Sequence, residues 1–187
     1  AHSGKKSLRF FAVPPNGSLV SKSSLDTVRL HFAQGDNLWF SAWYFLEKGF
    51  PTTMADFETS AMKWGPGPRM GLFSKNEGIQ VELKHFLKPK YSQDRENSLP
   101  FPSGEWIHVG LHLILSSSDD GVIEVWQGCE KIIDTRGKTL PKKTAILDRM
   151  QIGITATQEE TILFVDDIML SKIGSAKEME EKCLTSE

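Results

Sequence analysis

The sequence has little cysteine and no long apolar run. Its 187 residues include two cysteines, Cys129 and Cys183, and neither lies in a CxxC or another metal-binding spacing. A disulfide-dense scaffold is therefore excluded, while one disulfide and two free thiols both remain open. No apolar stretch approaches the roughly 20 residues that cross a bilayer, and the opening "AHSGKKSLRF" lacks the apolar centre of a signal peptide. We expect no membrane span.

An excess of one charge and the common catalytic signatures are also missing. The formal net charge is −2 and the isoelectric point is about 6.3, so the composition does not indicate nucleic acid or an anionic membrane as a partner. The GxSxG, P-loop, dinucleotide-binding and HExxH motifs are all absent. We therefore expect no nucleic-acid partner, and the motifs leave open whether the chain is an enzyme.

Short β-favouring segments fill most of the chain. Examples are "NLWFSAWYFL", "GIQVELKHF", "WIHVGLHLIL", "GVIEVWQG", "RMQIGITA" and "TILFVDDIMLS", and turn signals such as "GPGP", "NEG" and "DDG" separate them. Many short strands at regular spacing predict an all-β, two-sheet antiparallel β-sandwich, a single domain over residues 1–187. The segment "SAKEMEEKCL", residues 175–184, predicts a short C-terminal helix because it is rich in helix formers and starts with a serine cap.

Several strands alternate between an apolar and a polar face. In "GIQVELKHF", positions 79, 81 and 83 are apolar while positions 80, 82 and 84 are polar. One interpretation is the solvent face of an ordinary sandwich. The other is one concave sheet that binds a sugar chain, because sugar hydroxyls need hydrogen bonds and aromatic rings cover sugar faces. The candidate ligand-binding residues are Glu58, Arg69, Gln80, Glu82, Lys84, Glu124, Trp126, Gln151 and Thr155.

The charges among these candidates bear on the ligand. Arg69 and Lys84 could pair with a uronate or sulfate group, whereas three acidic side chains would repel a highly anionic ligand. We therefore expect a neutral or mildly acidic glycan as the partner.

The order of the motifs resembles a known group of jelly rolls. The matching segments are "HSGKKSLRF", "LWFSAWYFL", "ADFETSAM", "GEWIHVGLHLILSSSDDGVIEVWQGCEKIIDTRGKTL", "MQIGITA" and "TILFVDDIMLS". Together they are similar to the concanavalin A-like jelly rolls of the polysaccharide-lyase type, which include heparin lyase I, glucuronan lyase and alginate lyases. The same layout occurs in laminin-G-like and lectin-like modules that only bind.

The resemblance implies β-elimination on a uronic-acid polymer, in which a side chain neutralises the uronate and a Tyr or His removes the C5 proton. It aligns "DFETSAM" with the strand of the catalytic Gln and His, where this chain has Glu58 and Ser60. It aligns "QIGIT" with the Lys-x-Gly-x-Tyr strand, which places Gln151 at the Lys position and Thr155 at the Tyr position. The catalytic Tyr and His positions are therefore not retained.

These departures favour a carbohydrate-binding jelly-roll domain without catalysis. The first alternative is a polysaccharide lyase that uses Tyr91, from a loop-like "KPKYSQD", or His85. The second is a structural or protein-interaction domain. Jelly rolls of this group often hold a structural Ca²⁺, and the resemblance places Asp166 and Asp167 at the matching position, with oxygen ligands that calcium prefers. We expect an extracellular or secreted protein.

Overall fold

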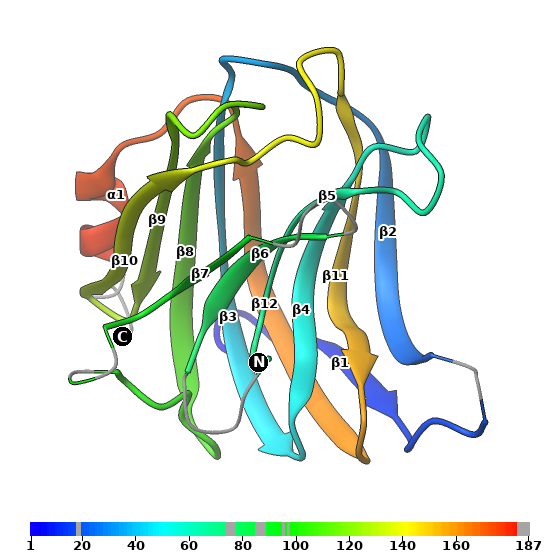
Figure 1. The fold of residues 1–187 in the computed structure, drawn as a ribbon. Coiled ribbons are helices and arrows are strands. Elements are labelled where there is room, and N and C mark those ends of the chain that lie inside the picture. The colour runs from blue at the N-terminus through cyan, green and yellow to red at the C-terminus, as the bar shows by residue number, and fades with distance from the viewer. Residues whose placement is uncertain (18–19, 74–77, 85–88, 95, 97, 183–187) are drawn as a thin grey trace.

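The computed structural model describes residues 1–17, 20–73, 78–84, 89–94, 96 and 98–182. Its strands form two six-stranded sheets, and the strand pairs among these residues are all antiparallel. Sheet A has the order β1 (Leu8–Ala12), β12 (Thr161–Ser171), β3 (Asn37–Lys48), β8 (Trp106–Ile114), β9 (Gly121–Gln127) and β10 (Glu130–Gly137). Sheet B has the order β2 (Ser21–Phe32), β11 (Leu147–Thr157), β4 (Pro51–Glu58), β5 (Gly67–Gly71), β6 (Gln80–Lys84) and β7 (Lys90–Ser92). The predicted all-β, two-sheet antiparallel sandwich is confirmed (Figure 1).

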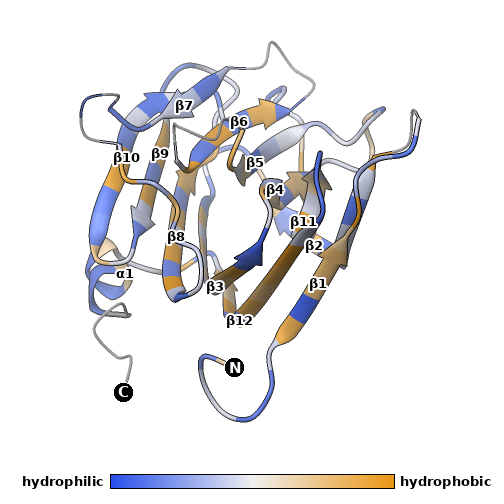
Figure 2. Cartoon of the chain, turned by 90° about the horizontal axis from the view of Figure 1, so that it is seen from below, coloured by the Kyte–Doolittle hydropathy of each residue, from blue (hydrophilic) through white to orange (hydrophobic). Residues whose placement is uncertain are grey.

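The main core lies between the two sheets and is formed by buried apolar side chains from both of them. Figure 2, coloured by hydropathy, shows hydrophobic residues on strands of both sheets. Phe40 of β3 and Phe57 of β4, both fully buried, meet edge to face across the two sheets with ring centroids 5.8 Å apart. Ile79 and Val81 also point into this core. The predicted inward face of "GIQVELKHF" is therefore correct.

The short helix α1 (Ala176–Lys182) packs on the outer face of sheet A, beside β9 and β10 in Figure 1. Ser175 caps it: the Glu178 amide donates to the Ser175 hydroxyl at 3.3 Å, and the Ser175 amide donates to the Glu178 carboxylate at 3.0 Å. The predicted helix is thus present, and its last two expected residues lie outside the described chain. In the described part of the chain, no helix has the length and apolar character needed to cross a membrane.

One predicted strand is shorter than expected. We expect "MADFETSAMKW" to alternate through Met62, but β4 ends at Glu58. A compact turn follows, in which the Thr59 amide donates to the Pro66 carbonyl and the Gly65 amide donates to the Met62 carbonyl. This turn lies at one end of sheet B.

Candidate functional site on the outer face of sheet B

A row of polar residues crosses sheet B from edge to edge. The strand register places one residue of the row on each of the six strands, directly opposite the next. In the order of the strands, the row is Asp26, Gln151, Asp56, Arg69, Glu82 and Lys90. Because directly opposite residues share a face, all six lie on the same side of the sheet, away from the core. We call this surface, with the charged and amide side chains beside the row, the polar face. Its members are Asp26, Asp56, Glu58, Arg69, Gln80, Glu82, Lys84, Lys90, Arg149 and Gln151.

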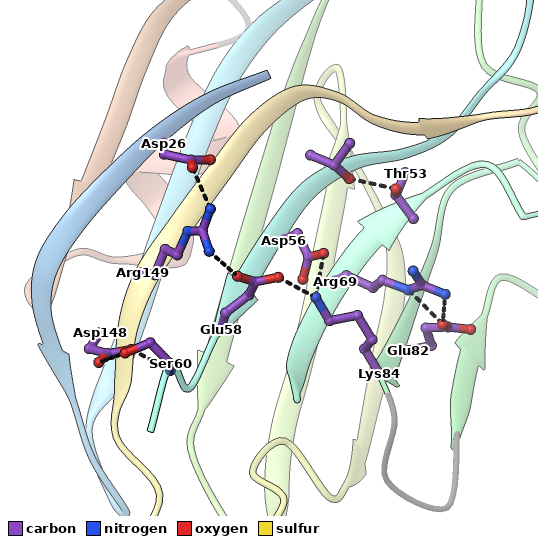
Figure 3. Close-up of polar contacts among 11 residues, drawn as sticks. Asp26, Thr53, Asp56, Glu58, Ser60, Arg69, Glu82, Lys84, Asp148 and Arg149 are labelled. Atoms are coloured by element: carbon purple, nitrogen blue, oxygen red, sulfur yellow. Dashed lines mark hydrogen bonds and ion pairs between the residues drawn. The ribbon is translucent and has the colours of Figure 1, made fainter. Parts of the chain in front are cut away.

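Lys84 is at the centre of the polar face, between two carboxylates (Figure 3). Its Nζ lies 2.7 Å from Asp56 Oδ2 and 2.5 Å from Glu58 Oε1, and all three side chains are nearly buried. β5 separates Lys84 on β6 from the acids on β4, and the β5 residue opposite Lys84 is Gly67. Because glycine has no side chain, the lysine can cross β5. A Cβ at Gly67 would lie 1.9 Å from the Phe57 carbonyl oxygen, so no other residue fits there.

Two arginines on the polar face are each held by carboxylates and remain partly exposed. Arg69 donates from Nε to Glu82 at 2.6 Å, and its side chain is 25% exposed. Arg149 contacts Asp26 and lies 3.3 Å from Glu58 Oε2, with 32% of its side chain exposed (Figure 3). A guanidinium has five N–H donors, so each arginine keeps donors beyond these pairs.

Asp56 is the most perturbed carboxyl group of the polar face. Burial raises its pKa to about 6, although the neighbouring Lys84 ammonium favours the ionised form. Its Oδ1 has no hydrogen-bond partner among the described residues. A carboxyl group that titrates close to neutral pH is a candidate for proton transfer.

Asp56→Asn should alter how stability depends on pH. The raised pKa means that the folded state binds the proton more tightly, so this stabilisation is present below the unfolded pKa near 4 and is lost as the pH rises through about 6. Asparagine does not titrate. The unfolding free energy of the variant minus that of the wild type is therefore expected to rise by about 2 kcal/mol between about pH 4.5 and about pH 7.5. Urea denaturation across this range measures the difference, and a flat profile would contradict the raised pKa.

The structure brings most of the predicted ligand residues together. Glu58, Arg69, Gln80, Glu82, Lys84 and Gln151 all lie on the polar face. Thr155 is on the same sheet but is buried, and its hydroxyl donates to the hydroxyl of Thr53 at 2.5 Å.

Sequence reasoning missed Asp26, Asp56, Lys90 and Arg149. Asp56 and Arg149 each stand two residues from a predicted site residue on the same strand, so the alternation could have found them.

The prediction that Glu124 and Trp126 join this site is wrong. Both lie on β9 and do face away from Ile123 and Val125, but β9 belongs to sheet A. Trp126 is fully buried beneath α1 against Trp39 and Met179. The alternation of apolar and polar residues shows which face of a strand a residue is on. It does not show which sheet the strand joins.

Glu124 has a local role on the outer face of sheet A. Its carboxylate lies 2.7 Å from His112 Nδ1 and 2.7 Å from Lys131 Nζ. Burial opposes its ionisation, but the hydrogen bonds from Lys131 and His112 outweigh that effect and hold its pKa below the usual range. His112 also stacks on Trp39 at 3.7 Å.

Tyr91, the loop-borne base of the alternative lyase prediction, lies on a strand and does not face the polar face. Tyr91 lies on the short strand β7, directly opposite Val81, so it shares the core-facing side of sheet B. Its hydroxyl donates to the Lys138 carbonyl at 2.9 Å, and its ring lies against Gly137. The other proposed base, His85, lies outside the described residues.

Asp166 and Asp167 lie in the middle of β12, where the N-terminal residues His2 and Ser3 reach sheet A. The amides of His2 and Ser3 donate to Asp166 Oδ2, and the Ser3 hydroxyl donates to Asp167 Oδ1 at 2.6 Å. The hydrogen bonds that the side chains of Ser3 and His2 make to Asp167 hold the pKa of this carboxyl group below its usual range. The described residues include no group of three or more His, Cys, Asp or Glu side chains that could hold a metal ion. Calcium at this position stays a prediction.

The fold and its polar face define the chain as a jelly-roll sandwich with a charged, partly buried site on one sheet. A family model described as polysaccharide lyase matches residues 1–169. The chain therefore belongs to the polysaccharide lyase family. No curated protein matches it at a significant level.

Solved structures share the fold at low sequence identity. An endo-β-1,4-glucuronan lyase from the fungus Trichoderma reesei is 14% identical with a TM-score of 0.69, and the match covers 90% of this chain and 82% of that one. Alginate lyase vAL-1 from Chlorella virus is 12% identical with a TM-score of 0.57, covering 91% and 86%. The binding domain of botulinum neurotoxin DC, solved with rat synaptotagmin II, is 10% identical with a TM-score of 0.60, covering 97% and 47%. Such likeness shows the fold alone, and enzymes and binding domains share it.

Proposed function

We propose that the chain is a polysaccharide lyase that binds a uronic-acid polymer on its polar face and cleaves it by β-elimination. Family membership over residues 1–169 is the observation that carries this proposal. The partly exposed arginines of the polar face support it, because a guanidinium binds a carboxylate through two parallel hydrogen bonds.

Arg69 and Arg149 are the proposed uronate-binding groups. The carboxylates of Glu82 and Glu58 orient them, and their remaining donors can reach a ligand above the sheet. Neutralising the uronate makes the C5 proton easier to remove, which is the first requirement of the elimination. Asp56, with its pKa near 6, is the proposed partner in proton transfer.

Carbohydrate binding without cleavage is the second candidate. One observation favours it: the described members of the polar face include no tyrosine and no histidine. Of the two tyrosines, Tyr44 is in the core and Tyr91 faces inward. In that case the same arginines would bind the glycan, and no unsaturated product would form.

An elimination assay separates the two candidates. The wild-type protein is incubated with glucuronan, with alginate and with a neutral polymer, and absorbance near ~235 nm reports the double bond made by elimination. Arg69→Ala and Arg149→Ala are each expected to lower kcat/KM at least about tenfold. Arg136→Ala is the matched control, because Arg136 lies on β10 of sheet A, and it should act like the wild type.

Each outcome of the assay has a distinct meaning. Saturable binding without absorbance, lost in Arg149→Ala, would replace the lyase proposal with the binding function. Neither binding nor absorbance for any polymer would contradict both candidates. Circular dichroism of each variant checks that the fold is intact.

We also propose that the protein works in an oxidising compartment, outside the cell. Cys129, in the turn between β9 and β10, is disulfide-bonded. Disulfides persist in secreted proteins and are rare in the reducing cytosol.

A further inference from the structure

A pocket of about 330 Å³ lies beside the polar face, at the end of sheet B where β2 and β4 end and β11 begins. Its volume is within the range of about 300–1,000 Å³ that is usual for small-ligand sites. Leu30 and His31 of β2, the turn after β4 and the segment before β11 form its walls. We call it the end pocket.

The end pocket adjoins the polar face through covalent neighbours and hydrogen bonds. Thr59 and Asp148 line the pocket. Thr59 directly follows Glu58 in the sequence, and Asp148 directly precedes Arg149, and both of these neighbours belong to the polar face. The Ser60 amide donates to Asp148 Oδ1 at 2.8 Å, and the Ser60 hydroxyl donates to Asp148 Oδ2 (Figure 3). These bonds fix the turn against β11, so the end pocket lies at the same end of sheet B as Glu58 and Arg149.

The pocket contains a buried hydroxyl without a protein partner. Thr59 is 3% exposed, and its Oγ1 makes no hydrogen bond among the described residues. An unpaired buried hydroxyl costs about 1–3 kcal/mol, so a native structure normally satisfies it. A sugar hydroxyl is a suitable partner because it can both donate and accept.

The charged side chains of the pocket lining are the Asp148 carboxylate and the Lys142 ammonium. Both oxygens of Asp148 are engaged by Ser60. Lys142 is exposed and makes no ion pair within the described part of the chain, and His31 also lines the pocket. Met62 and Ile146 add apolar surface that can cover a sugar ring.

We propose that the end pocket binds one further uronic acid residue of the polymer, with Lys142 paired to its carboxylate and Thr59 bonded to a ring hydroxyl. The pocket thereby favours acidic chains long enough to reach it from the polar face. This inference rests on the proposed function, because it takes the ligand of the polar face to be a uronate polymer.

The test compares two adjacent lysines. Lys142→Glu is expected to weaken binding of long glucuronan oligosaccharides at least about fivefold, because it places a carboxylate against the ligand's carboxylate. Lys143→Glu, an exposed neighbour outside the pocket lining, makes the same charge change and should stay within about twofold of the wild type. Isothermal titration with short and long oligosaccharides measures both, and the shortest ligands should not distinguish the variants.

A second variant tests the proposal by filling the end pocket with a large side chain. Ala61→Trp adds an indole to the exposed turn that lines the pocket, and it should remove the affinity gained by longer chains. If Lys142→Glu and Lys143→Glu weaken binding equally, or if Ala61→Trp leaves the chain-length dependence unchanged, the end pocket is not a sugar site. Wild-type protein that binds no acidic oligosaccharide of any length would instead contradict the proposed function.

Discussion

Replacing Lys84 by methionine is expected to lower the free energy of unfolding by about 3–5 kcal/mol at neutral pH. The substitution keeps the apolar stem and removes the ammonium group that lies between Asp56 and Glu58. Both carboxylates are nearly buried, so they would lose their common counter-ion without gaining access to water. Urea denaturation measures the effect, which should shrink as the pH falls through about 6 and Asp56 takes up a proton.

Lys48→Met is the matched control. Lys48 pairs with Glu160 at 2.6 Å, a distance similar to those made by Lys84, but both side chains of this pair are largely exposed. Little measurable change in stability is expected there. Adding Asp56→Asn and Glu58→Gln to Lys84→Met should recover much of the lost stability. If Lys84→Met cost no more than Lys48→Met, the central ion pairs of the polar face would be solvated rather than buried.

Trp126→Ala is expected to cost about 3–5 kcal/mol of stability and leave the polar face intact. Trp126 is fully buried between sheet A and α1, where it packs with Trp39 and Met179. At Gly110 of β8, a Cβ would lie 2.9 Å from the Met179 sulfur, so the helix rests directly on the sheet. The truncation would leave a cavity that this close packing cannot fill.

Trp64→Ala provides the comparison for Trp126→Ala. The Trp64 side chain belongs to the turn after β4 and the residue is 70% exposed, so its loss should change stability far less. Thermal unfolding ranks the two variants. Binding of glucuronan to Trp126→Ala, measured well below its melting temperature, should match the wild type. A binding defect without loss of stability would contradict this prediction and indicate that Trp126 takes part in ligand binding.

Alternation within single strands predicts much of the site. Gln80, Glu82 and Lys84 lie on the face opposite Ile79 and Val81, as the sequence pattern indicates. The pattern is reliable there because successive side chains of a strand point to opposite faces whatever the strand pairs with. The helix at the C-terminus follows from equally local information, its serine cap and its helix-forming residues.

The errors arise where a property depends on distant segments. "GVIEVWQG" has the same alternation as "GIQVELKHF", yet β9 joins sheet A and β6 joins sheet B. Tyr91 resembles a loop residue in the sequence, but pairing with Val81 makes it part of β7 and turns its ring toward the core. Strand order and register depend on which segments meet after the chain has collapsed.

By itself, the sequence determines that this protein is an all-β sandwich and which side of each strand is polar, because both follow from short-range alternation and turn residues. Only the tertiary structure decides that Asp26, Asp56 and Lys90 share one row with Arg69, and that Glu124 and Trp126 lie elsewhere. The physical reason is that hydrogen bonds between strands distant in the sequence set the register. That register brings Lys84 across Gly67 to its two carboxylates and forms the polar face.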